Sequence, residues 1–189
     1  MSGKLLSCFL NGVLCGIGAY GCCKLDPLVQ PFGYMSCVMV YTHCILGLIG
    51  SLRKAANCFN PQLCLTRTLM EVGHMTLINT QFYHSTMGSG RALLFGLSMG
   101  LLGCLSIQMP KGIFWRPAIG FFNILCLLCN PHHASSWGTH MMIAVLYAAG
   151  SDGVYYLKGY DRLSYAERLY EVCNIGITRL AIKAFMEKM

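Results

Sequence analysis

The sequence predicts an all-α protein, a polytopic bundle of about six transmembrane helices with an amphipathic helix at its C-terminus. Hydrophobic residues make up 55% of the 189 residues, charged residues only 11%, and the mean hydropathy is +0.53. A typical soluble domain has about 25% charged residues. So few charges cannot cover a globule in water. Uncharged runs of about 20 residues also recur along the chain, and a helix of this length crosses a hydrocarbon core of about 30 Å.

The predicted spans follow the uncharged runs in chain order. They cover residues 5–23, 32–52, 68–88, 92–109, 117–129 and 134–150. The last two come from one apolar stretch that divides at Asn130-Pro131, a pair of residues that favours a turn. Pro117 suits the first turn of a helix, where its missing N–H group costs nothing. Although Lys4 and the apolar run after it resemble a secretory signal, we expect this run to remain as the first span.

The third predicted span is the most polar one, because it contains Glu71, His74 and Gln81. Lysine and arginine near span ends favour the cytoplasmic or matrix-like side of a membrane. If residues 68–88 cross, most basic residues and both termini lie on that inner side, and Lys24 and Arg91 lie outside. If they do not cross, the charges divide nearly evenly. We therefore expect a crossing, and the alternative is four or five spans with residues 68–88 as a surface helix.

Small residues recur every three or four positions along four predicted spans, so that each set lies on one helix face. The glycines in these sets are Gly12, Gly16, Gly47, Gly96, Gly100 and Gly103. Helices in lipid associate through close backbone approach, which small residues permit. We therefore predict that these glycines lie at helix contacts, within the chain or with partner subunits.

A polar path is predicted on the third span, because four of its side chains share a sector of about 80° on a helix. They are Glu71, His74, Gln81 and Ser85. A charge near the bilayer centre costs about 3 kcal/mol or more, so this face should point into the bundle or toward water. It could relay protons. The interpretation that we favour for Glu71 is a local ion pair with Arg67, four residues earlier on the same helix.

Three histidines, His43, His84 and His140, are candidate ligands for haem or a transition metal, because neutral imidazole binds both. His132 and His133 fall in the predicted turn before the sixth span. The chain has no short metal-ligand motif. We therefore favour hydrogen bonding of His43 across helices and solvation of the turn histidines over a haem site.

The C-terminal residues 158–189 are predicted to form a unit separate from the bundle of residues 1–157, on the inner side of the membrane. Ser164 and Glu167 have the spacing of a capping box. The apolar face of this helix includes Leu169, Cys173, Ile177 and Leu180. An amphipathic helix of this kind docks into a partner's groove or lies on a membrane, and mixed charges on its polar face favour a protein partner. The alternative is a helix that caps the protein's own bundle.

The function expected from these features is that of a non-catalytic structural or assembly subunit of a larger membrane protein complex. The sequence has no P-loop, dinucleotide fingerprint or catalytic triad pattern. The net charge of +7 follows the predicted topology, so nucleic acid is not an expected partner. The expected partners are membrane lipids and other membrane subunits, in the mitochondrial inner membrane or an endomembrane. A small channel or proton-coupled transporter and a haem-binding redox subunit remain as alternatives.

Overall fold

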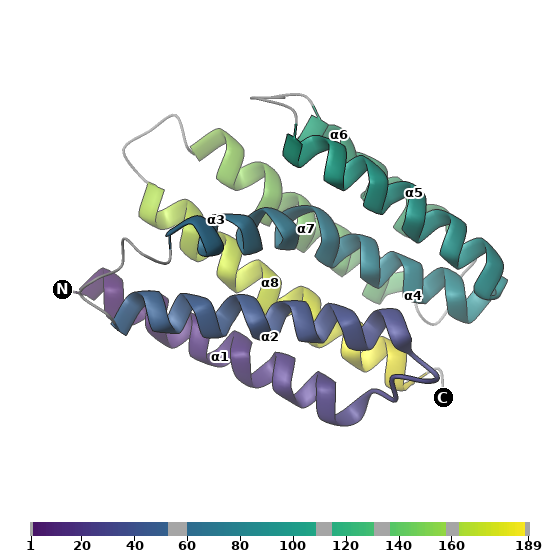
Figure 1. Ribbon diagram of the computed structural model, residues 1–189, viewed down its shortest axis with the longest axis horizontal. Coiled ribbons are helices and arrows are strands. Elements are labelled where there is room, and N and C mark those ends of the chain that lie inside the picture. The colour runs from purple at the N-terminus through teal and green to yellow at the C-terminus, as the bar shows by residue number, and fades with distance from the viewer. Residues whose placement is uncertain (1, 53–59, 109–114, 131–136, 158–162, 188–189) are drawn as a thin grey trace.

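The computed structural model describes residues 2–52, 60–108, 115–130, 137–157 and 163–187, and within these ranges all regular secondary structure is helical. The helices lie side by side and run up and down through one bundle (Figure 1). The prediction of an all-α helical bundle is therefore confirmed.

Each predicted span coincides with a helix. Five of the spans correspond to α1 (Ser2–Lys24), α2 (Pro31–Leu52), α5 (Ser89–Gln108), α6 (Trp115–Cys129) and α7 (Trp137–Leu157). The predicted C-terminal helix corresponds to α8 (Leu163–Met186). The polar segment is part of a continuous helical stretch made of α3 (Asn60–Leu69), the π-helical turn η2 (Met70–His74) and α4 (Met75–Met87). Pro31 occupies the first position of α2, which suits a residue without an N–H group.

A single residue, Gly88, connects α4 to α5. Its φ angle is +86°, a left-handed conformation that glycine adopts without the steric cost of a Cβ atom. The backbone N–H of Ala92 then bonds to the Gly88 carbonyl at 3.3 Å. This sharp reversal places α5 directly beside α4.

The main hydrophobic core lies where α2, α4, α7 and α8 meet. Phe82 of α4 contacts Phe185 of α8, with ring centroids 5.0 Å apart, and Ile143 of α7 and Ile177 of α8 belong to the same cluster. The C-terminal helix is therefore packed inside the bundle, against α1 and α7, and is not a separate surface helix. The predicted domain boundary lies between residues 157 and 158. It borders residues 158–162, which are outside the part of the chain that the structure describes.

The first helix begins at one end of the bundle and α8 ends at the other (Figure 1). The prediction placed both termini on one side, because it counted six crossings and put the last helix outside the membrane on the inner side. Since α8 instead runs the length of the bundle beside α1, the two termini lie at opposite ends.

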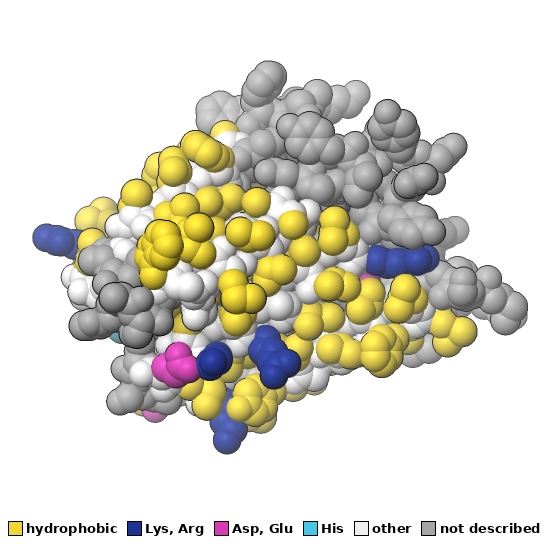
Figure 2. All heavy atoms as spheres, turned by 180° about the vertical axis from the view of Figure 1, so that it is seen from behind, with side chains coloured by type: hydrophobic (Ala, Val, Ile, Leu, Met, Phe, Trp, Pro, Cys, Tyr) yellow, Lys and Arg dark blue, Asp and Glu magenta, His cyan; other side chains and the backbone are white. Residues whose placement is uncertain are grey.

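Much of the surface is apolar. Figure 2 shows hydrophobic side chains spread across the described part of one face, with basic side chains as separate groups. On α5, Leu94, Leu97 and Leu101 are each at least 65% exposed. Among the described residues, Leu5–Lys24 and Pro31–Gly50 are long and apolar enough to cross a membrane, and Ala118–Cys129 is a shorter apolar helix. Association with a membrane is thus supported by two helices, while six crossings remain a prediction.

Candidate functional site

The π-helical turn at Met70–His74 interrupts the polar segment at the place where its ionisable side chains lie. A π-turn adds a residue to one helical turn, and each added residue rotates the rest of the helix by about 100°. Such turns occur often at functional sites. Periodicity in the sequence assumes a regular helix and does not reveal this insertion. The candidate functional site is therefore centred on this turn.

Glu71 lies in the turn and forms the ion pair that its spacing from Arg67 predicts. Arg67 Nε is 3.6 Å from Glu71 Oε1, and the two side chains are 27% and 18% exposed. The Arg67 guanidinium also lies over the ring of Tyr170 on α8, with 5.7 Å between Cζ and the ring centroid. Tyr147 of α7 donates a hydrogen bond from its hydroxyl to the Glu71 backbone oxygen at 3.0 Å. Two neighbouring helices therefore hold the turn.

His74, the last residue of the turn, is fully buried against α8. Its Nε2 atom shares a hydrogen bond of 3.4 Å with Thr178 Oγ1. Thr178 Oγ1 also donates to the Asn174 carbonyl at 2.7 Å, and Asn174 Nδ2 donates to the Tyr170 carbonyl at 2.9 Å. A buried titratable imidazole is thus connected to a row of polar groups along one face of α8.

His43 of α2 bonds across the helices, as the favoured interpretation of this residue predicts. Its Nδ1 atom shares a hydrogen bond of 3.0 Å with Thr66 Oγ1 of α3. Thr66 directly precedes Arg67 in the sequence. The helix that carries the turn is therefore held by α2 as well as by α7 and α8.

The structure divides the predicted polar path into two parts. Gln81, about 15 Å further along the helix than Glu71, accepts hydrogen bonds through Oε1 from the backbone N–H groups of Phe32 (3.2 Å) and Gly33 (3.1 Å). These amides belong to the first turn of α2, where backbone N–H groups have no carbonyl acceptor within their own helix. Ser85 bonds to the Gln81 carbonyl at 2.9 Å. Glu71 and His74 therefore lie in the π-helical turn, whereas Gln81 and Ser85 lie near the opposite end of the helix.

A second buried polar cluster lies between these parts. Asn79 Nδ2 donates to the carbonyl of Asn123 on α6 at 2.8 Å and to its Oδ1 atom at 3.1 Å. Thr76 Oγ1 is 3.3 Å from Asn123 Nδ2. Sequence reasoning missed Asn123, and its one signal is that it is polar within the otherwise apolar run 117–129.

The candidate haem ligands have different partners. His43 bonds to Thr66 as described above, and His84 Nε2 shares a hydrogen bond of 3.2 Å with Ser89 Oγ. His140 is buried against the Phe82 ring, with centroids 4.3 Å apart. No group of three or more His, Cys, Asp or Glu side chains is placed to hold a metal ion in the part of the chain that the structure describes. His132 and His133 lie outside the described residues.

The predicted packing glycines separate into two sets. A Cβ atom at Gly47, Gly96 or Gly103 would lie 2.8 Å from Asn11 Oδ1, 3.1 Å from Thr80 Cγ2 or 2.8 Å from Val72 Cγ1, respectively. These three glycines therefore allow close contacts within the bundle. Gly12, Gly16 and Gly100 have nothing within 4 Å of such an atom and are exposed.

The predicted docking residues on α8 are similarly divided. Cys173 and Ile177 are buried inside the bundle, Leu180 is half-buried, and Leu169 is exposed. The apolar face of this amphipathic helix is thus covered mainly by the protein's own helices, which is the alternative that the sequence left open.

The comparisons with known proteins give a family without a known activity. The model of a family described as a domain of unknown function (DUF4791) matches residues 27–185. No curated protein and no solved structure matches the chain. The matched residues include the π-helical turn and all of its partners on α2, α7 and α8.

Proposed function

The chain belongs to the DUF4791 family, and we propose that it is a multi-pass membrane protein that acts as a non-catalytic structural or assembly subunit of a membrane complex. The observation that carries this proposal is how the polar residues of the stretch 60–87 are used. Gln81, Asn79 and His74 each bond to another helix. Polar groups that hold helices together inside an apolar exterior are typical of membrane bundles.

The positions of the basic residues support a membrane crossing by the whole bundle. The helices α2, α5 and α7 end, and α3, α6 and α8 begin, at the end of the bundle where α1 begins (Figure 1). The segments between these helices in the sequence contain Arg53, Lys54, Lys111, Lys158 and Arg162. At the opposite end, residues 25–30 and 88 contain no lysine or arginine, and the basic residues there, Lys24, Arg91 and Lys183, lie in the terminal turns of α1, α5 and α8. Because basic connections stay on the inner side, the start of α1 is proposed to face the cytoplasm or matrix and the end of α8 the other side. The mitochondrial inner membrane and an endomembrane both fit this orientation.

The surface proposed to contact a partner is the outer face of α5. Leu94, Leu97 and Leu101 are spaced by three and four residues, so they lie on one side of the helix with Gly100 beside them. An exposed glycine between leucines permits a second helix to approach closely. We expect this face to pack against a helix of another membrane subunit.

The experiment is purification of the complex in mild detergent with a side chain added to the α5 face. Gly100→Leu should release a stoichiometric partner subunit and reduce the mass of the particle. Gly90→Leu is the matched control, because it adds the same side chain at an exposed and open position in the first turn of α5. A wild-type protein that purifies as a stable monomer, or a partner that Gly100→Leu retains, would contradict the proposal.

A proton-linked activity is the second candidate, because the π-helical turn contains both Glu71 and the buried His74. Intramembrane ionisable residues are rare and usually functional. In liposomes, wild-type protein should then conduct protons, and Glu71→Gln combined with His74→Gln should abolish the flux, whereas the control Ser85→Ala should not. Absence of flux in the wild type, or flux unchanged in the double variant, removes this candidate.

A further inference from the structure

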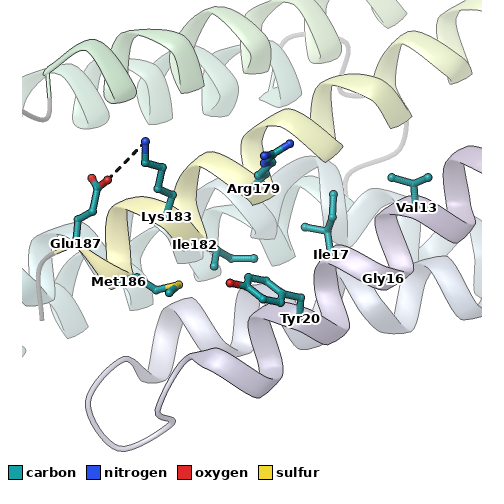
Figure 3. A pocket seen from close by; sticks show the side chains of 9 residues that line it. All are labelled: Val13, Gly16, Ile17, Tyr20, Arg179, Ile182, Lys183, Met186 and Glu187. Atoms are coloured by element: carbon teal, nitrogen blue, oxygen red, sulfur yellow. Dashed lines mark ion pairs between the residues drawn. The ribbon is translucent and has the colours of Figure 1, made fainter.

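A groove on the surface of the bundle runs between the C-terminal halves of α1 and α8. It encloses about 760 Å³, within the range of about 300–1,000 Å³ typical of sites for small molecules. Val13 and Ile17 of α1 and Ile182 and Met186 of α8 give it apolar walls. Figure 3 shows Ile182 and Met186 extending from α8 into the space between the two helices.

Gly16 keeps this groove open on the α1 side. It lines the groove, and a Cβ atom placed on it would have no other atom within 4 Å. A side chain added at this position would therefore extend into the groove from an unobstructed Cβ atom.

The α8 side of the groove is positively charged. Arg179 and Lys183 are one helical turn apart on α8 and both line the groove. Figure 3 shows their side chains extending from α8 at the edge of the groove farther from α1. Glu187 forms an exposed ion pair with Lys183, with 3.6 Å between Nζ and Oε1. With two cations and one carboxylate, this side has a net positive charge. The Tyr20 ring lies across from it on α1.

We propose that the groove binds one phospholipid molecule, with an acyl chain between the apolar walls and the phosphate at Arg179 and Lys183. An apolar channel with cations along one side complements a ligand that is a hydrocarbon with an anionic head. The helix α1 ends at Lys24, one turn after Tyr20, so the cations lie toward the end of the bundle where headgroups of a bilayer would be. This inference rests on the membrane placement in the proposed function and does not depend on the partner at α5.

The first test removes the space for the acyl chain. Native mass spectrometry of the full-length protein in detergent, with added palmitoyl-oleoyl phosphatidylglycerol, should detect one bound lipid. Gly16→Leu should lose this lipid. Gly12→Leu should retain it, because Gly12 is an equally open and exposed position one turn earlier on α1 that does not line the groove.

The second test removes the charges. Arg179→Gln and Lys183→Gln should each weaken phosphatidylglycerol binding about fivefold, the usual effect of one basic residue at a lipid surface. Arg91→Gln, an exposed cation at the start of α5 outside the groove, should leave it unchanged. Diacylglycerol with the same chains, which has no phosphate, should bind weakly and with no dependence on either cation.

Three outcomes overturn the lipid site. They are the absence of a bound lipid, equal lipid binding by Gly16→Leu and Gly12→Leu, and a stoichiometric dimer that Gly16→Leu dissociates, since a second copy would then occupy the groove. The proposed function fails through different results. These are recovery of the protein from the soluble fraction without detergent, purification of the wild type as a stable monomer, or retention of the partner subunit by Gly100→Leu.

Discussion

The two halves of the helical stretch 60–87 use their polar side chains differently. In the half around the π-helical turn, the contacts made by the Glu71 and His74 side chains are long, 3.6 Å to Arg67 and 3.4 Å to Thr178, whereas the hydrogen bond that Tyr147 donates to the Glu71 backbone is 3.0 Å. In the half formed by α4, Gln81 binds two backbone amides at 3.1 and 3.2 Å, and Asn79 binds a backbone carbonyl at 2.8 Å. Hydrogen bonds weaken as they lengthen beyond about 3.2 Å.

This difference indicates that the two halves have different roles. Amide side chains bonded to the backbone of α2 and α6 fix the positions of whole helices. The ionisable side chains, in longer contacts, hold their neighbours less firmly. We therefore expect the α4 half to dominate the free energy of unfolding and the half around the π-helical turn to contribute little to it.

The largest expected effect is that of Gln81→Leu. This change leaves the N–H groups of Phe32 and Gly33 without their acceptor, and a buried unsatisfied donor costs about 1–3 kcal/mol. We expect the free energy of unfolding, measured by SDS titration in mixed micelles, to fall by about 3 kcal/mol. Ser85→Ala is the control, since its hydroxyl bonds only to its own helix and should change stability by at most about 0.5 kcal/mol. Equal midpoints for the two variants would show that Gln81 does not anchor α2.

A smaller effect is expected where α5 packs against the π-helical turn. A Cβ atom in Gly103→Ala would lie 2.8 Å from Cγ1 of Val72, so the substitution overpacks the contact and should destabilise by about 1–2 kcal/mol. Gly100→Ala, on the same helix with open space, should be stabilising by about 0.5–1 kcal/mol through helix propensity. The same SDS titration measures both. If Gly103→Ala has no cost, Val72 moves freely and the turn is even less firmly held than its contacts indicate.

The sequence predicted the positions of the helices well because the apolar runs and their breaks are local features. Pro31, Gly88 and Asn130-Pro131 each lie at or next to a helix end. The segment with Glu71, His74 and Gln81 was correctly predicted to be helical with its polar face inward, since His74 and Gln81 are both buried. The shared face follows from periodicity, and its inward orientation follows from the cost of polar groups in lipid.

What each buried group bonds to could not be predicted in the same way. Gln81 caps α2 because the chain brings residues 32 and 33 beside residue 81, and no local pattern records that proximity. The π-helical turn adds a residue without any sequence signal. The amphipathic pattern of α8 was recognised, but such a pattern indicates a covered face without indicating whether a partner or the protein itself covers it.

The smallest expected effect is that of Glu71→Gln, which tests the half around the π-helical turn. The change removes the charge but leaves the backbone oxygen of residue 71, which accepts the Tyr147 hydroxyl, in place. An i,i+4 ion pair on a helix contributes about 0.3–0.5 kcal/mol, so the SDS midpoint should hardly move. Tyr147→Phe is the matched variant, because it removes that hydrogen bond and should cost about 1 kcal/mol. A loss for Glu71→Gln as large as that for Gln81→Leu would mean that Glu71 holds the bundle together. The two halves would then have the same structural role, and the basis for a proton-linked activity at the π-helical turn would be lost.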